Sequence, residues 1–193
     1  MERRPAKVLE PQDVLRLLRH VRHQRYPERN RVIILLSVKA GLRAGEIAGL
    51  EWPMVLGSDQ CVADLITIAR GIAKGGVGRQ IPLHADLKKA LRVLHRVECK
   101  PTVGPLIRSE RGSGFTAASM VNWFGRTYRQ LSLVGCSSHS GRRTFITKAA
   151  RVLAKTGGSL RDIQELAGHA ALTTTEKYIE GDRVAQRKLI SLL

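Results

Sequence analysis

The feature that most constrains the fold is a change of pattern in the middle of the chain. Over most of the sequence, apolar residues recur at helical spacing, as at Val14, Leu17 and Val21 near the N-terminus. Between residues 52 and 83 the pattern changes to short apolar and β-branched segments separated by Gly and Asp. The sequence therefore predicts an α+β fold that is mostly α-helical and contains one small sheet.

Start and stop signals divide the chain into short elements. We expect helices over residues 11–21, 31–40, 44–50, 85–97, 116–131, 139–153 and 159–168, and a last short helix that starts within 173–175 and includes Tyr178. Three strands, at residues 52–56, 64–70 and 79–83, are expected to form an antiparallel sheet. We interpret residues 1–8 as a basic tail or linker remnant, 9–180 as one domain, and 181–193 as a C-terminal helix or tail.

The charge balance favours a polyanionic partner. The 193 residues include 33 Lys and Arg against 16 Asp and Glu, a formal net charge of +17. Such an excess attracts nucleic acids through their phosphates, whatever the base sequence. Nucleic acid is the expected partner, although ribosomal, histone-like and simply soluble basic proteins have a similar balance. The hydrophobic fraction of 43% is ordinary for a globular domain and argues against disorder.

Cysteine usage and hydropathy predict a reducing, aqueous compartment. Cys61, Cys99 and Cys136 are odd in number and form no CxxC pair, which indicates neither a zinc site nor a disulfide framework. The N-terminus has no apolar signal core, and the longest apolar run, residues 32–38, is too short to cross a bilayer. A cytoplasmic protein with no membrane partner, no bound metal and no cofactor is expected.

Six side chains from separate stretches form a set suited to breaking a phosphodiester without a metal ion. They are Arg43, Lys74, His139, Arg142, His169 and Tyr178. An arginine presents two parallel N–H donors to two oxygens, so a pair of arginines suits a phosphate and its more highly charged transition state. A lysine in a flexible turn is suited to protonating a leaving oxygen, and a histidine to accepting the proton of a nucleophile.

The nucleophile of this set is expected to be a tyrosine, and the chain has three. Tyr26 precedes Pro27 in a charged stretch, and Tyr128 lies on an amphipathic segment that suits packing. Tyr178 follows TTTEK and lies nine residues after His169. A phenol, with a pKa of about 10, needs nearby positive charge and a proton acceptor to act as a nucleophile. Tyr178 is therefore the expected nucleophile.

These motifs, in this order, resemble the catalytic domain of the tyrosine recombinases, also called phage integrases, over roughly residues 8–180. The motifs are AGLRAGEI with Arg43, AKGGVGRQIPL with Lys74, HSGR with His139 and Arg142, LAGHA with His169, and TTTEKY with Tyr178. The resemblance implies an enzyme that cuts and rejoins double-stranded DNA without metal or ATP. Tyr178 would attack the scissile phosphate and form a 3′-phosphotyrosyl link, while Lys74 would protonate the leaving 5′-oxygen. His139 would help to take the tyrosine proton.

Further residues are expected to support this chemistry. The resemblance makes Glu46 a buried partner that holds the site together. Six basic residues are expected to contact DNA phosphates: Arg70, Arg79, Lys88, Arg126, Arg143 and Arg151. The helix after Tyr178 packs either on its own domain or on a neighbouring protomer, so a dimer or tetramer on DNA is compatible with the sequence, as is an accessory protein.

Two departures from the family pattern bear on these expectations. Gly141 and Arg143 stand where Leu and His are usual; Gly141 is expected to loosen local packing and Arg143 to add charge near the phosphate. The helical core-binding domain that usually precedes the catalytic domain is expected to be absent, which is compatible with a short natural recombinase, an excised catalytic domain or an unusual split enzyme. A non-catalytic DNA-binding regulator and a type IB topoisomerase are the alternative functions.

Overall fold

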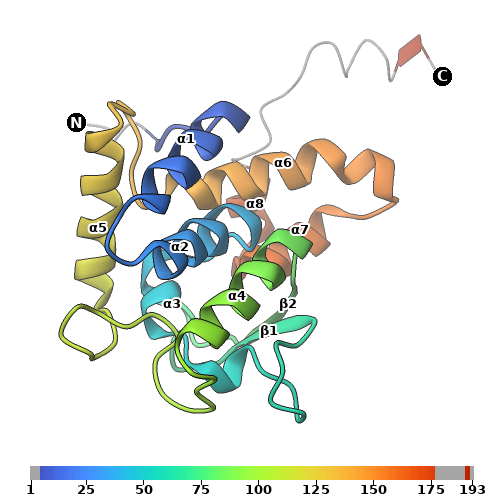
Figure 1. Cartoon of the computed structure of the whole chain (residues 1–193). Helices are drawn as coiled ribbons and strands as arrows, with labels where there is room; N and C mark the ends of the chain where they lie inside the picture. Colours follow the sequence, from blue (N-terminus) through green and yellow to red (C-terminus); the bar gives the residue numbers. More distant parts are fainter. Residues whose placement is uncertain (1–4, 177–189, 192–193) are drawn as a thin grey trace.

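The sequence folds into short helices packed around α2 (Pro27–Lys39), with one small sheet towards one edge, as the computed structural model in Figure 1 shows. The structure describes residues 5–176 and 190–191. In that part of the chain the elements are α1 (Pro11–Arg22), α2 (Pro27–Lys39), α3 (Ala44–Gly49), a 3-10 turn η1 (Trp52–Met54), β1 (Leu65–Ile68), β2 (Arg79–Pro82), α4 (Ala85–Val97), α5 (Ala117–Gln130), α6 (Ser140–Thr156), α7 (Leu160–Ala167) and α8 (Leu172–Glu176). None of these helices is long and apolar enough to cross a membrane.

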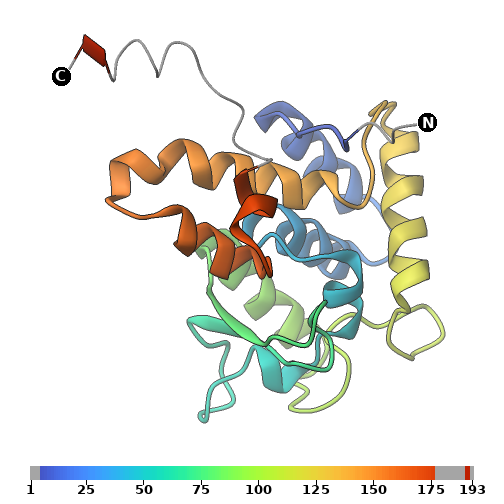
Figure 2. The same cartoon turned by 180° about the vertical axis from the view of Figure 1, so that it is seen from behind.

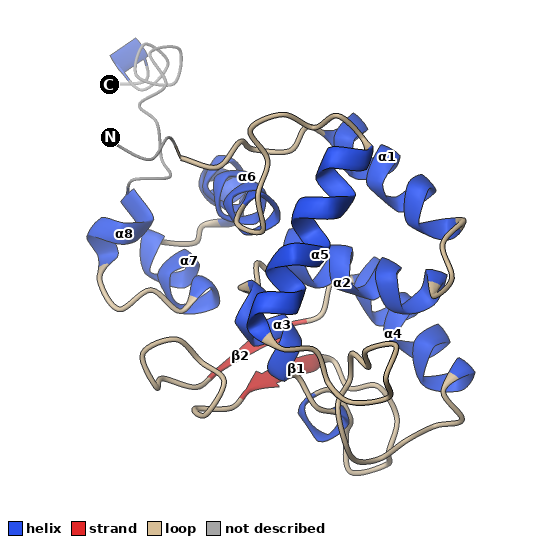
Figure 3. Cartoon of the chain, turned by 90° about the vertical axis from the view of Figure 1, so that its left-hand side faces the viewer, coloured by secondary structure: helices blue, strands red, loops and turns tan. Residues whose placement is uncertain are grey.

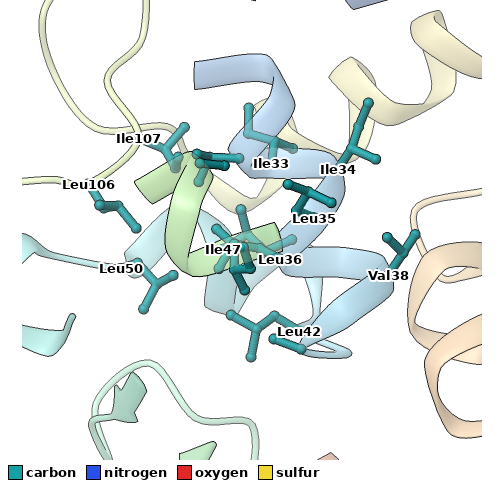
Figure 4. Packing of buried hydrophobic residues seen from close by; sticks show 14 of the residues in the cluster. Ile33, Ile34, Leu35, Leu36, Val38, Leu42, Ile47, Leu50, Leu106 and Ile107 are labelled. Atoms are coloured by element: carbon teal, nitrogen blue, oxygen red, sulfur yellow. The ribbon is translucent and has the colours of Figure 1, made fainter. Parts of the chain in front are cut away.

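Helix α2 forms the centre of the hydrophobic core. Residues 32–36 are all apolar and buried, so the helix is apolar on every side and must be covered all round. Helices α1, α3, α4 and α6 pack against it, and Figure 4 shows its side chains beside Leu42 and Ile47 of the following segment. This packing places the turn after α2, which carries Arg43, at a defined position beside the core.

The sheet has two strands in the described residues, whereas three were expected. β1 and β2 pair as an antiparallel hairpin. Residues 52–56 instead form η1, followed by a single bridge from Leu56 to Val62. Pro53 explains the difference, because proline lacks the N–H that a ladder needs and its fixed φ suits the first turn of a helix. The expected fold class, mostly helical with a small antiparallel sheet, is confirmed.

Residues 6 and 7, just before α1, lie against the start of α6 and the turn that precedes it. Two hydrogen bonds of 3.0 Å hold them: the Lys7 N–H donates to Gly135 O, and Arg143 Nη1 donates to Ala6 O. Residues 1–4 lie outside the described part of the chain, as do residues 181–189 and 192–193 of the expected C-terminal helix or tail. The interpretation of those segments stays a prediction.

Helices α6 and α7 enclose a smaller second core around Ile146 and Ile163. Helix α7 begins as predicted, because Asp162 accepts hydrogen bonds from the N–H and the hydroxyl of Ser159 at 2.6 and 3.0 Å. It ends at Gly168, which has a left-handed φ of 62°. Figures 2 and 3 show α7 and α8 between α6 and the β1–β2 hairpin, and α7 contacts β2.

Gly141 allows α6 to approach α2 closely, so the expectation that it loosens packing is wrong. A Cβ at this buried position would lie 2.9 Å from Ser37 Cβ and 3.1 Å from Val38 Cγ1, and closer still to Ser37 Oγ. Distances this short are steric overlap, so a larger residue must push the helices apart. Because Arg142 is the next residue on α6, such a displacement also moves its guanidinium.

We expect Gly141→Ala to lower the free energy of unfolding by about 1–3 kcal/mol, as measured by urea denaturation, because of this overlap. Adding Ser37→Gly removes the opposing side chain, so the double variant should lose less than the sum of the single changes. The control is Gly125→Ala on α5, where the nearest atom to a new Cβ, Arg129 Nη1, lies at 3.5 Å. That change should be neutral or stabilise by up to about 1 kcal/mol. Equal losses at both glycines would contradict this explanation.

Candidate active site

One buried carboxylate holds two arginines from separate segments. Glu46, on α3, is 1% exposed. Its Oε1 accepts hydrogen bonds from Arg43 Nη1 and Arg79 Nη1, each at 2.9 Å, and its Oε2 accepts from Arg79 Nη2 at 3.0 Å and from the Arg43 backbone N–H at 2.9 Å. Burial alone raises the pKa of Glu46, but the hydrogen bonds from Arg79 and from the Arg43 backbone outweigh burial and lower it. Glu46 is therefore a charged anchor beside the first predicted catalytic arginine.

At the carboxyl end of α7, three guanidinium groups donate hydrogen bonds to three successive backbone carbonyl oxygens. Arg79 Nε donates to Leu166 O at 3.0 Å, Arg142 Nη2 to Ala167 O at 2.7 Å, and Arg43 Nη2 to Gly168 O at 3.1 Å. The last carbonyls of a helix have no partner within the helix, and its C-terminal dipole favours cations. The end of α7 thus gathers three arginines that are far apart in sequence.

Arg142 also fixes the turn that precedes Arg43. It is 4% exposed, and its Nη1 donates to Gly41 O at 2.7 Å. Gly41 has a left-handed φ of 64°, and a Cβ there would lie 2.9 Å from Phe145 Cγ and closer to Cδ1. The close approach of α6 to this turn therefore requires glycine. Through Gly41, Arg142 and Arg43 are held in one cluster.

His169 follows α7 directly and lies inside this cluster. It is 8% exposed, and its Nδ1 lies 2.9 Å from Oγ1 of Thr175 on α8. Burial, followed by the charges of Arg142 and Arg43, lowers the pKa of His169 to about 4. The imidazole is therefore neutral at neutral pH in the absence of an anion.

Two further predicted residues lie at the edge of the cluster. His139 immediately precedes α6, and Lys74 is exposed in the hairpin between β1 and β2. Partial desolvation lowers the pKa of His139, and the charges of Arg142, Lys74 and Arg43 lower it further. Because charges act on this imidazole from three segments, the fold brings both edge residues towards the arginines. Their catalytic roles stay predictions.

We expect His169 to make the protein less stable in acid. Its pKa is about 4 in the folded protein against an ordinary value of 6.5, so between these values the unfolded chain binds a proton that the folded chain does not. The free energy of unfolding should fall as the pH decreases from 6.5 to 4, by at most about 3 kcal/mol. His169→Asn should flatten this part of the pH profile measured by urea denaturation. Parallel profiles for the variant and the wild type would contradict the low pKa.

The nucleophile proposed from the sequence, Tyr178, lies outside the described residues. The other two tyrosines, Tyr128 and Tyr26, lie in the described part of the chain. The Tyr128 side chain is 3% exposed and its ring is stacked 6.0 Å from Phe124, so burial raises the pKa of its phenol. The Tyr26 ring lies 4.3 Å from the guanidinium carbon of Arg29. Both of these tyrosines therefore have structural roles apart from the cluster.

The six basic residues expected to contact DNA fall into two groups. Arg70, Arg126 and Arg151 are exposed. The other three have protein partners: Arg79 is bound to Glu46, Lys88 pairs with Asp64, and Arg143 donates to Ala6 O. The inward position of Arg79, with 8% of its side chain exposed, argues against its expected contact with phosphate. The sequence missed this role because Glu46 and Leu166, its partners, lie 33 and 87 positions away.

The fold and the site together define a class of domain: a mostly helical domain in which three arginines gather at the carboxyl end of one helix, with one histidine among them and a second histidine and a lysine near their edge. Where the structure describes the chain, it shows no cluster of His, Cys, Asp and Glu able to hold a metal ion. The profile of the phage integrase family matches residues 7–183, and the chain belongs to this family.

Individual proteins agree with this assignment. The tyrosine recombinase XerC of Mesorhizobium japonicum is 33% identical over 156 residues, which cover 78% of this chain and 46% of that protein. The tyrosine recombinase XerA of Thermococcus kodakarensis is 30% identical over 94% of this chain and 62% of its own length. The chain thus spans about half the length of several curated relatives that it matches.

Solved structures share the fold. The Tn1549 transposon integrase in complex with transposon right end DNA aligns with all of this chain and 67% of its own, with a TM-score of 0.76 and 19% identity. A XerA recombinase structure aligns with 96% of this chain and 65% of its own, with a TM-score of 0.73 and 21% identity. At these identities the likeness shows a common fold.

Proposed function

We propose that this protein is a site-specific DNA recombinase that cuts and rejoins double-stranded DNA through a 3′-phosphotyrosyl intermediate. The observation that carries the proposal is the convergence of Arg43, Arg142 and His169 at the carboxyl end of α7. Donors fixed in advance around one point stabilise the charge that develops on a phosphate in the transition state. The family assignment supports the same chemistry.

In the proposed reaction, the oxygen of Tyr178 bonds to phosphorus while the bond from phosphorus to the 5′-oxygen breaks. Lys74 gives a proton to the departing 5′-oxygen, and His139 helps to take the phenol proton. Rejoining reverses the step, with the 5′-hydroxyl of another strand as nucleophile. The covalent link conserves the energy of the broken bond, so the reaction needs no ATP.

The position of α8 supports Tyr178 as the nucleophile. Thr175 on α8 is fully buried and bonded to His169, within the arginine cluster. Tyr178 follows three residues later, and three residues span at most about 11 Å. This short spacing along the chain supports the proposal that Tyr178 acts at the predicted phosphate site.

The proposed partner is double-stranded DNA, with exposed Arg70, Arg126 and Arg151 contacting phosphates. A λ integrase dimer bound to a core site and a XerH recombinase bound to difH share this fold. We propose that this chain likewise acts as an oligomer on DNA, with or without an accessory protein. A cytoplasmic location agrees with the free thiols of Cys61, Cys99 and Cys136.

A covalent-trapping experiment tests the function. The protein is incubated with a pool of nicked duplexes of random sequence, whose short 5′-hydroxyl strand diffuses away after cleavage, and adducts are separated on a denaturing gel. We expect an adduct whose peptide map places the DNA on residue 178. Binding without an adduct would favour the DNA-binding regulator, and relaxation of supercoiled plasmid without recombinant products would favour the type IB topoisomerase.

A further inference from the structure

We infer that Arg79 is a positioning residue that holds the Lys74 hairpin at the phosphate site. The inference rests on the proposed function, because it concerns the proton that Lys74 gives to the leaving oxygen. Arg79 is the first residue of β2 and follows Lys74 by five positions. Its side chain is nevertheless only 8% exposed, unlike that of an arginine poised to meet DNA.

The guanidinium of Arg79 joins three elements. Its two Nη atoms bind both oxygens of Glu46 on α3, at 2.9 and 3.0 Å, and its Nε binds Leu166 O at the end of α7, at 3.0 Å. It also packs directly over Gly168, where a Cβ would lie 2.8 Å from Nη1 and 3.0 Å from Cζ. The flat fork of arginine suits this combination, which lysine has too few fixed donors to make.

The hairpin is anchored at both ends and open between them. At its first end, Ile72 packs on Gly49 of α3, where a Cβ would lie 2.7 Å from Ile72 Cγ2. At its second end stands Arg79. Between them, Gly75 and Gly76 have left-handed φ values of 89° and 70°, and a Cβ on either would meet nothing within 4 Å. Lys74 therefore lies on a short, permissive segment whose reach depends on the two anchors.

A cleft separates this hairpin from α7. It has a volume of about 680 Å³, and Lys74, Arg79, Leu166 and His169 are among the residues that line it. Arg79 reaches α7 from the hairpin side of the cleft through Leu166 O. Loss of the Arg79 guanidinium removes the ties of the hairpin to α3 and α7. The β1–β2 pairing, the contact of Arg43 with Glu46 and that of Arg142 with Ala167 O do not involve this side chain. The expected defect is in leaving-group protonation rather than in phosphate binding.

A sulfur-bridged DNA substrate separates these two effects. In ordinary DNA the departing 5′-oxygen must be protonated as its bond to phosphorus breaks. When sulfur replaces that oxygen, the leaving group departs as a thiolate, whose parent thiol has a pKa of about 8.5, so it needs no proton donor. A variant in which Lys74 no longer reaches the leaving group should therefore regain its rate of adduct formation on the sulfur substrate. A variant that no longer holds the phosphate should stay slow on both substrates.

We expect Arg79→Gln to slow adduct formation on ordinary DNA about 100-fold, within the usual range for general acid catalysis, and to come within about fivefold of wild type on sulfur-bridged DNA. Lys74→Ala should behave in the same way, and Arg142→Ala should be slow on both substrates. Exposed Arg96→Gln on α4, which removes the same charge, should match wild type on both. DNA affinity, measured by fluorescence anisotropy, should be equal for Arg79→Gln and Arg96→Gln.

Each other outcome is decisive. An Arg79→Gln variant that is equally slow on both substrates would show that Arg79 acts through the phosphate-binding arginines, and wild-type rates on ordinary DNA would show that it has no role. If Arg79→Gln does not fold, as judged by circular dichroism, Arg79→Lys is tested instead, because it keeps the charge but lacks the planar pair of donors. A rate of adduct formation that recovers on sulfur-bridged DNA would then support the inference, and a rate that stays slow would contradict it. If the wild-type protein forms no adduct with ordinary DNA and none with sulfur-bridged DNA, the result would count against the proposed function itself.

Discussion

Replacing Tyr178 by phenylalanine should abolish covalent attachment to DNA while leaving DNA affinity almost unchanged. The substitution removes the one oxygen that would bond to phosphorus, but it alters neither the charge nor the arginine cluster. We expect adduct formation to fall by at least about 1,000-fold, as when the nucleophile of a catalytic set is removed. The rate is measured from adducts on a denaturing gel, and the affinity by fluorescence anisotropy.

Tyr26→Phe is the matched control for this experiment. The Tyr26 ring stacks near Arg29, at 4.3 Å, and a phenylalanine ring keeps this cation–π contact. The control should therefore form adducts at the wild-type rate. If Tyr178→Phe forms adducts as fast as wild type, another residue is the nucleophile and the assignment is wrong.

The second large effect is expected on stability, at Glu46. Glu46→Gln removes the carboxylate charge but keeps the shape, and it leaves the guanidiniums of Arg43 and Arg79 without their shared counter-ion. Breaking a buried ion pair by removing one partner typically costs about 3–5 kcal/mol. Because 18% of the Arg43 side chain is exposed, we expect a loss near the lower value, about 3 kcal/mol, in the free energy of unfolding from urea denaturation.

Glu165→Gln provides the control for Glu46→Gln. Glu165 lies on α7 with 69% of its side chain exposed and pairs with Arg161 at 3.4 Å. Exposed pairs of this kind contribute less than about 1 kcal/mol, so the control should be almost as stable as wild type. Similar small losses for both variants would mean that the buried carboxylate does not hold the cluster together.

Much of the fold follows from local chemistry that a sequence displays. Helix α7 begins where Ser159 and Asp162 predict it and ends at Gly168, because capping and left-handed closure need residues close in the chain. The same locality explains the exception at residues 52–56. Their apolar residues are typical of a strand, but Pro53 withholds an N–H and the segment winds into η1.

The candidate site was predictable in its residue types and less so in its geometry. Arg43, Arg142 and His169 lie together, as the resemblance implies, and the expected burial of Glu46 is observed. The expectation that Gly141 loosens packing was wrong because the space for a side chain at this position is limited by Ser37, on a helix about a hundred positions earlier. No pattern near Gly141 carries that information.

The sequence by itself determined the helical periodicity, the helix caps, the excess of positive charge and the supply of side chains able to act on a phosphate, since each depends on residue type or short spacing. Tertiary structure alone decided which arginines lie inside. Arg79 and Arg151 are the same residue type in the same basic chain, yet one is bound to Glu46 and the other is exposed. The difference arises because a guanidinium leaves water where other segments of the chain supply acceptor oxygens, as Glu46 and Leu166 O do for Arg79.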